Sequence, residues 1–361
     1  MPTLPANWRC GINLGNSLDC FQSGVNDLTT EIAWDNPYTT RDMIGMFAKA
    51  GFDILRIPVT WDVHMGPGPD WLVDPAWMAR VQEVVRWGIE AGMTVMLNVH
   101  HDFTWMRQEL SLLVDWLPRY RRLWQQIAEA FRDYGDELIL QGANEPNLVG
   151  GDNCDWGSGN RNARAAINVM NHTFVRTVRE TGGNNATRWL CIPGLAGRPL
   201  PDCMKDMIMP KDDRLIYTIH CYTPVRFVSR RDNQNDTAIF DDKVRDAVLE
   251  MFEDIKQWAV PHGLPIMLTE WGAAAKRLPD GQINDKERMR FVETFLKCAN
   301  ELGAPCIWWD NGYFERGNQS RALFDRETLP ATVLVWSKPS LKTVTPMTND
   351  LQTIFERCVF M

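Results

Sequence analysis

Eight short apolar runs divide this chain, and each of them ends in polar or glycine-rich residues. Segments with a helical pattern separate most of the runs. Strands that alternate with helices favour a parallel sheet, because parallel neighbours need a long crossover connection. The runs occupy residues 10–16, 53–59, 94–100, 138–144, 188–194, 215–222, 265–271 and 305–311.

The helical segments repeat apolar residues at spacings of three and four. Met78, Val81, Val85 and Ile89 form one such face, as expected for a helix with one side on a core. Three prolines leave room for only a short helix within 195–214. The other long helices are expected at 114–135, 163–182, 241–260 and 289–302.

Eight strand–helix units predict the α/β class and a closed (β/α)₈ TIM barrel. We expect one catalytic domain, residues 1–361, with its active site at the C-terminal ends of the strands. The alternative is an open, doubly wound sheet. No GxGxxG or Walker sequence follows the first run, which weakens the nucleotide-binding forms of that alternative.

Charge and composition exclude several classes of partner. The net charge is −8 and no long basic run occurs, so nucleic acid and anionic membrane surfaces are poor candidates. No apolar run reaches the roughly 18 residues of a membrane span. The first eight residues lack the pattern of a signal peptide. The nine cysteines are odd in number and form no CxxC, which argues against a disulfide framework and a structural zinc site.

Two of the apolar runs lead into a glutamate. Residues 138–146 read LILQGANEP and end with Glu145, and residues 265–272 read PIMLTEWG and contain Glu270. Either glutamate alone could be structural, at a helix start or in an ion pair. At matching strand ends the two favour catalysis, because an unpaired buried charge is costly. Two carboxyl groups suit glycoside hydrolysis when one is protonated, to donate to the leaving oxygen, and the other is ionised, to attack the anomeric carbon or activate water.

Other polar residues stand where strands end. Arg56 would keep a glutamate anionic if it reached one, and Tyr222 could hydrogen-bond the same carboxylate. His220 and Tyr222 are two positions apart, so on a strand they face the same way. Asn144 offers an amide to a sugar hydroxyl. The structural alternative for Arg56 is a pair with a core acid.

Aromatic residues offer apolar faces to sugar rings. Trp309 and Trp34 are the candidates for this role. Trp308 is expected in the core, because neighbouring strand residues alternate in direction. His100 has a structural alternative as a hydrogen-bonded core histidine.

A metal site at His100, His101 and Asp102 is the competing chemistry. Adjacent strand residues point to opposite faces, so both imidazoles would reach one ion only awkwardly. No HxH or HExxH is present, and a serine hydrolase would need a GxSxG sequence that the chain lacks.

At these residues the sequence resembles glycoside hydrolase family 5, within the clan of retaining (β/α)₈ glycosidases. The similarity is greatest to the bacterial endoglucanase and xyloglucanase branch, subfamily 4. It runs nearly from end to end, in the order expected for the family. The matching stretches are GINLGNSLD (11–19), EIAWDNP (31–37), AGFDILRIPVTW (50–61), VMLNVHHD (95–102), QGANEPN (141–147), IHCYTP (219–224), LTEWGA (268–273) and IWWDNG (307–312).

The resemblance implies a double displacement with retention and without cofactor or metal. Glu145 would be the general acid/base and Glu270 the nucleophile, held by Arg56 and Tyr222. Residues 150–156 match no family stretch closely, which leaves substrate preference open. The sugar under attack would contact Arg56, His100, Asn144, His220, Tyr222 and Trp309, and neighbouring sugars would contact Asn16, Trp34 and His101.

The expected activity is a retaining endo-β-1,4-glucanase, of the cellulase type, on cellulose, mixed-linkage glucan and xyloglucan. The alternatives are β-mannanase or xylanase-type activity on the same scaffold, and a non-catalytic glycan-binding barrel. The pair of glutamates with Arg56 and Tyr222 argues against the last, because binding does not require that pair. We expect a monomer that is secreted, an inference from the polymeric substrate.

Overall fold

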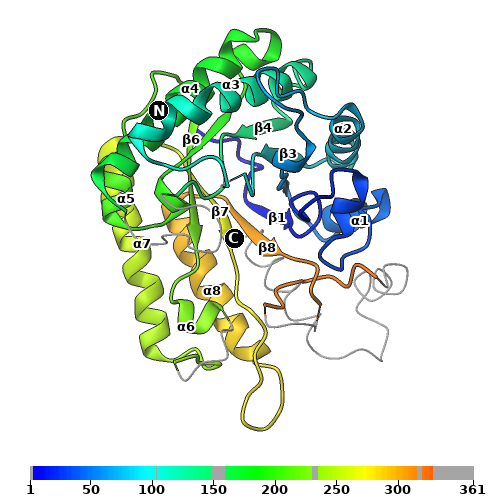
Figure 1. Cartoon of the computed structure of the whole chain (residues 1–361). Helices are drawn as coiled ribbons and strands as arrows, with labels where there is room; N and C mark the ends of the chain where they lie inside the picture. Colours follow the sequence, from blue (N-terminus) through cyan, green and yellow to red (C-terminus); the bar gives the residue numbers. More distant parts are fainter. Residues whose placement is uncertain (1–2, 103, 148–158, 230–234, 315–318, 328–361) are drawn as a thin grey trace.

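A computed structural model of the chain describes residues 3–102, 104–147, 159–229, 235–314 and 319–327. Its strands are parallel and close into a barrel in chain order (Figure 1). Strand β1 pairs with both β2 and β8, so the sheet has no edge and the open-sheet alternative is excluded. The predicted (β/α)₈ barrel is confirmed. The strands are β1 (Cys10–Leu14), β2 (Ile54–Ile57), β3 (Thr94–Asn98), β4 (Leu138–Gln141), β5 (Leu190–Pro193), β6 (Leu215–Cys221), β7 (Ile266–Trp271) and β8 (Cys306–Asp310).

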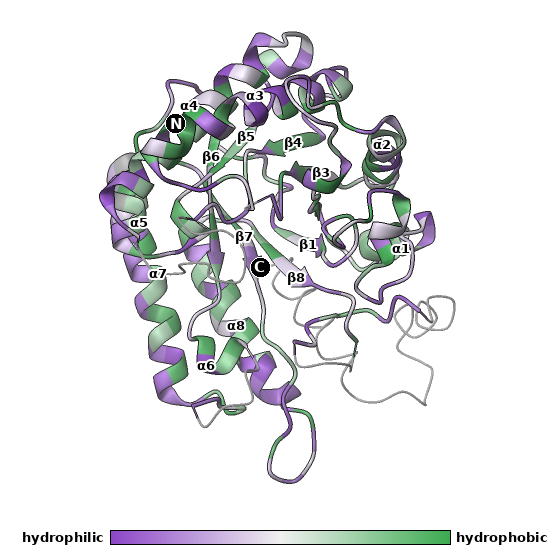
Figure 2. Cartoon of the chain, in the orientation of Figure 1, coloured by the Kyte–Doolittle hydropathy of each residue, from purple (hydrophilic) through white to green (hydrophobic). Residues whose placement is uncertain are grey.

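Helices surround the barrel (Figure 1). They are α1 (Arg41–Lys49), α2 (Pro75–Glu90), α3 (Leu113–Ala130), α4 (Arg161–Glu180), α5 (Pro201–Lys205), α6 (Val225–Val228), α7 (Asp242–His262) and α8 (Asp285–Leu302). Short 3₁₀ helices are η1 (Leu28–Ile32), η2 (Asp62–His64), η3 (Leu110–Leu112), η5 (Gly183–Ala186) and η6 (Leu195–Gly197). Figure 2 shows hydrophobic and hydrophilic residues alternating around α7 and α8, as expected when one face packs on the barrel. Among the described residues, no helix is long and apolar enough to cross a membrane.

Local sequence explains where two of these helices begin and end. Helix α2 begins at Pro75, and the Asp74 carboxylate accepts hydrogen bonds from the first free backbone N–H groups. The predicted helix 114–135 is too long at its end. Helix α3 stops at Ala130, because the chain turns there, with Tyr134 donating to the Phe131 carbonyl. The short helix expected within 195–214 is α5.

Two layers of side chains fill the barrel interior. On a given strand, the residue in one layer and the residue in the other are two positions apart, so both point to the same face of the strand. The layer nearer the strand N-termini is apolar, and we call it the apolar layer. Trp8 covers it, with its indole N–H donating to Thr94 Oγ1 at 2.9 Å. The apolar layer contains Ile54, Met96, Ile139, Cys191, Ile216, Met267 and Ile307, packed with Trp8 and Trp189. Above it, the polar layer contains Asn13, Arg56, Asn98, Gln141, Thr218 and Thr269, all buried.

Candidate active site

Glu145 and Glu270 face one cavity at the C-terminal end of the barrel. Glu270 lies in β7, whereas Glu145 lies beyond Gln141, where β4 ends, so the predicted strand 138–144 is too long. A carboxylate oxygen of Glu145 and one of Glu270 lie within 4.8 Å of each other. This separation fits the roughly 5–5.5 Å of retaining glycosidases and not the roughly 6.5–9.5 Å of inverting ones. The cavity, of about 330 Å³, is lined by His100, His101, Asn144, Glu145, Ala196, Arg198, Pro199, His220, Tyr222, Thr223, Val225, Ser229, Glu270, Trp309 and Arg321.

Glu270 is held from two sides. Arg56 Nη1 donates to Oε1 at 2.7 Å, and the Tyr222 hydroxyl donates to Oε2 at 3.1 Å. The Arg56 side chain is fully buried and that of Glu270 is 6% exposed. Both contacts fix the position of the carboxylate group. These are the two contacts that the sequence predicts for Glu270.

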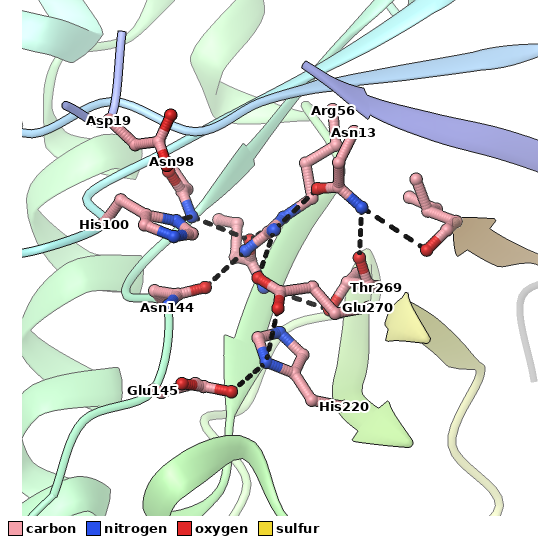
Figure 3. A network of polar contacts seen from close by, with 12 residues as sticks. Asn13, Asp19, Arg56, Asn98, His100, Asn144, Glu145, His220, Thr269 and Glu270 are labelled. Carbon is pink, nitrogen blue, oxygen red and sulfur yellow. Dashed lines mark hydrogen bonds and ion pairs between the residues drawn. The ribbon is translucent and has the colours of Figure 1, made fainter. Parts of the chain in front are cut away.

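The polar layer surrounds Arg56 with oxygen atoms (Figure 3). Arg56 Nη1 also donates to Asn13 Oδ1 at 2.7 Å, Nη2 donates to Asn144 Oδ1 at 2.7 Å, and Nε donates to Gln141 Oε1 at 2.9 Å. A buried guanidinium is tolerated only when its donors and its charge are matched in this way. Arg56 therefore fixes both the nucleophile candidate and the Asn144 amide.

Glu145 lies in a different environment from Glu270. Its Oε1 is 2.7 Å from His220 Nδ1. Burial raises the pKa of Glu145 to about 7, although one-fifth of its side chain is exposed, and the charges of Arg56 and Arg198 act in the opposite direction. Burial also lowers the pKa of His220 to about 4, so this imidazole is neutral near pH 7. Two carboxyl groups with such different surroundings can serve as acid and as nucleophile.

His220 and Tyr222 contact different glutamates. Strand β6 ends at Cys221, so Tyr222 lies just beyond it. The pairing of β6 with β7 shifts register between Ile219 and His220, which places His220 opposite Glu270. His220 Nδ1 is consequently 3.6 Å from Glu270 Oε2 while it contacts Glu145. The strand irregularity thus places His220 within reach of both glutamates.

His100 and His101 both line the cavity. We expected them to point to opposite faces, and that expectation is wrong, because β3 ends at Asn98 and strand alternation does not apply beyond it. Their rings are 4.4 Å apart and nearly perpendicular. Asn98 Nδ2 lies 3.1 Å from His100 Nδ1. Burial, with the charge of Arg56, lowers the pKa of His101 to about 3.

Asp102 does not complete a metal site with these histidines. It is fully buried, and its two oxygens accept hydrogen bonds from the Trp61 backbone N–H at 3.1 Å and Trp105 Nε1 at 3.3 Å. The carboxylate beside the imidazoles is Asp19, whose Oδ2 lies 3.7 Å from His101 Nε2. Asp102 therefore ties the segment after β3 to Trp61 and Trp105, instead of serving as a metal ligand with His100 and His101.

The tryptophans divide between core and cavity. Trp308 is fully buried, and its Nε1 donates to the Arg321 carbonyl at 2.8 Å, so the prediction that it packs in the core is confirmed. Trp309 is half-buried in the cavity wall, parallel to the His100 ring at 5.6 Å.

Trp34 and Asn16 lie outside the set of residues that line the cavity. The Trp34 ring packs against Phe21 at 5.4 Å and His101 at 5.5 Å, next to the cavity wall. Asn16 is nearly buried, in the left-handed conformation with a φ of 55°. Residues 150–156, which matched no family stretch, lie outside the described residues.

The sequence analysis assigned no role to Asn13, Gln141, Arg198 and Arg321, which the structure places at the site. Asn13 and Gln141 each interrupt an apolar strand with an amide, and this is a signal that the sequence did contain. Arg198 and Arg321 come from irregular segments, where no periodicity marks them. The Arg321 guanidinium lies 5.3 Å from the centre of the Tyr222 ring.

A parallel barrel with two carboxyl groups of unequal environment in one cavity has the arrangement of a retaining glycoside hydrolase. The family model described as Cellulase (glycosyl hydrolase family 5) matches residues 18–315. The chain belongs to glycosyl hydrolase family 5, and it is a retaining glycoside hydrolase.

Individual relatives agree with this assignment. Endoglucanase A of Ruminococcus albus is 37% identical over 326 residues, covering 90% of this chain and 87% of the relative. A broad specificity GH5-4 endoglucanase from Clostridium longisporum superposes with a TM-score of 0.86 at 28% identity, covering 98% of this chain and 96% of the other. The Ruminococcus champanellensis enzyme of the same description, with bound cellotriose, gives 0.83 at 34% identity and covers 94% and 99%. The predicted resemblance to subfamily 4 is confirmed.

Proposed function

We propose that this protein is an endo-β-1,4-glucanase that cleaves β-glucans by double displacement. The observation that carries the proposal is the pair Glu145 and Glu270, which share one cavity but differ in their contacts. The similar proteins support the substrate class, because several are endoglucanases and some structures hold cellotriose. One similar structure is that of a xyloglucan-specific endo-β-1,4-glucanase from a metagenomic library, so we include xyloglucan among the candidate substrates.

In the first step Glu145 acts as the acid and Glu270 as the nucleophile. The pKa of Glu145, about 7, keeps a proton available for the leaving oxygen near neutral pH. A Glu270 oxygen forms a bond to the anomeric carbon as the glycosidic bond breaks. The contacts from Arg56 and Tyr222 hold that carboxylate in place.

In the second step Glu145, now a carboxylate, takes a proton from water, and the water oxygen replaces Glu270 on the anomeric carbon. The Asn144 amide, fixed by Arg56, would bind the 2-hydroxyl of the sugar. We assign the remaining sugar contacts by place: His100, His220 and Trp309 beside the glutamates, and Asn16, Trp34 and His101 further along the chain of sugars.

The polymeric substrate also bears on where the enzyme works. Because β-glucan chains are found outside the cell that degrades them, we infer that the protein is exported. We further propose that it acts as a monomer.

The test compares wild type, Glu270→Ala and Glu253→Ala on barley β-glucan, xyloglucan, carboxymethyl cellulose, mannan and xylan, with product anomers followed by NMR. Glu253 is an exposed glutamate on α7 and serves as the matched control. We expect glucan cleavage with β-anomers formed first, lost only in Glu270→Ala. Initial inversion, or full activity of Glu270→Ala, would overturn the assignment. Cleavage of mannan or xylan alone would replace the substrate class.

A further inference from the structure

The turn after β5 is strained and bound to the Glu145 loop. Ala196 has a φ of 52°, a conformation that is unfavourable for a residue with a side chain. Its backbone N–H donates to the Pro146 carbonyl at 2.7 Å. Gly197 follows at φ 60°, and a Cβ there would lie 3.3 Å from the His220 ring. Strain of this kind persists where the surroundings enforce it, and it concentrates at functional sites.

The strained turn places Arg198 in the cavity. Arg198 is half-buried and lines the same cavity wall as Glu145. Its charge lowers the pKa of Glu145, against the effect of burial. The backbone hydrogen bond from Ala196 to Pro146 links the backbone of the turn that carries Arg198 to the backbone of the segment that carries Glu145.

The three arginines around the cavity are not equivalent. Arg56 also acts on Glu145, but its Nε, Nη1 and Nη2 are all hydrogen-bonded to other groups. Arg321 donates to the Val228 carbonyl at 2.9 Å, and it is Tyr222 and Glu270 whose charges act on it. Arg56 on β2 acts on Glu145, and the charged and titratable groups that line the cavity with it are His100, His101, Arg198, His220 on β6, Tyr222, Glu270 on β7 and Arg321.

We propose that Arg198 is a positioning residue for the second step, where it holds Glu145 as the carboxylate that accepts the proton of water. The proposal rests on the proposed function of Glu145 as acid/base. In this step the bond between water oxygen and anomeric carbon forms, the ester bond to Glu270 breaks, and the proton moves to Glu145. Until that bond breaks Glu270 carries no charge, so Glu145 is the anion of the pair and a nearby cation stabilises it.

The test uses 2,4-dinitrophenyl β-cellobioside, whose leaving group needs no proton, so the second step limits kcat. In Arg198→Gln we expect the rising limb of the pH profile of kcat to move up by about one unit. At the pH of the wild-type midpoint, kcat then falls several-fold. Azide, which attacks the anomeric carbon without a base, should restore turnover and give the glycosyl azide. Arg198→Lys should keep most of the wild-type profile.

Two controls separate this proposal from the assignment of Glu145. Glu145→Gln should show the azide effect strongly, whereas Arg290→Gln, at an exposed arginine of α8 outside the cavity, should show none. One outcome would overturn the inference about Arg198 and leave the acid/base assignment of Glu145 intact. In that outcome azide rescues Glu145→Gln, whereas Arg198→Gln keeps the wild-type pH profile of kcat or changes only KM. If azide has no effect on Glu145→Gln, the acid/base assignment itself fails, and the role of Arg198 fails with it.

Discussion

The two layers inside the barrel are built from the same strands and differ in what fills them. On five strands an apolar residue is followed two positions later by an amide, a hydroxyl or a charge, as at Ile54 and Arg56 or Ile139 and Gln141. Both layers are buried, so exposure to water does not explain the difference. The comparison teaches that the N-terminal part of a barrel strand can supply core residues for stability while its C-terminal part supplies residues for the active site.

The two layers contribute to folding in opposite ways. Each large side chain of the apolar layer stabilises the fold by about 1.5–3 kcal/mol through burial. The ion pair of Arg56 and Glu270 adds little net stability, because desolvation offsets the attraction between the two charges. The polar layer is tolerated because its members satisfy one another.

Removing the charge at the centre of the polar layer should have the largest effect. Arg56→Met leaves Glu270 and three amide oxygens without their donor, which should lower the free energy of unfolding by about 3–5 kcal/mol. We also expect kcat to fall by about 100-fold or more, because the nucleophile is no longer positioned. Urea unfolding and glucan hydrolysis measure both. Arg290→Met, at an exposed arginine of α8, is the control, and unchanged stability of Arg56→Met would contradict this account of the layer.

Shortening a side chain of the apolar layer should lower stability and leave activity unchanged. Ile139→Ala removes buried methyl groups, so we expect a loss of about 2–5 kcal/mol in unfolding free energy. The kcat of the remaining folded protein should equal that of wild type, because no site residue loses a contact. The measurement is kcat at a temperature where the variant is fully folded. A reduced kcat there would mean that the two layers are coupled.

The smallest effect concerns the proton on Glu145. With a natural glucan, the acid must be protonated, so kcat/KM should fall with a midpoint near pH 7, and to about one-tenth one pH unit higher. Because burial raises the pKa in the folded state, Glu145 favours folding at low pH, and this contribution is lost as the pH rises from about 4.3 to 7. Glu145→Gln should remove that slope from unfolding measurements. A basic limb far from pH 7 would refute the assignment of the proton.

Much of the fold was predictable because strand runs and helical periodicity follow directly from burial. The two glutamates and Arg56 were also predictable, because charges at the ends of apolar runs need a reason. Strand ends were harder to predict. His100, His101 and Glu145 all lie beyond the ends of their strands, where the rule of alternating faces no longer holds.

The remaining residues of the site depend on the tertiary structure. Arg198 enters the cavity from a strained turn, and Arg321 from the segment after β8. Neither segment has a periodic pattern, so the sequence does not indicate that Arg198 and Arg321 lie in the cavity. The amides of Asn13 and Gln141 become meaningful only when the barrel brings them to Arg56.

Trp8 and the isoleucines and methionines of the apolar layer close the barrel below Arg56. Among the described residues, the catalytic cavity therefore does not continue along the barrel axis. We therefore expect a glucan chain to lie across the C-terminal ends of the strands instead of being threaded through the barrel. Binding of that kind does not require a chain end.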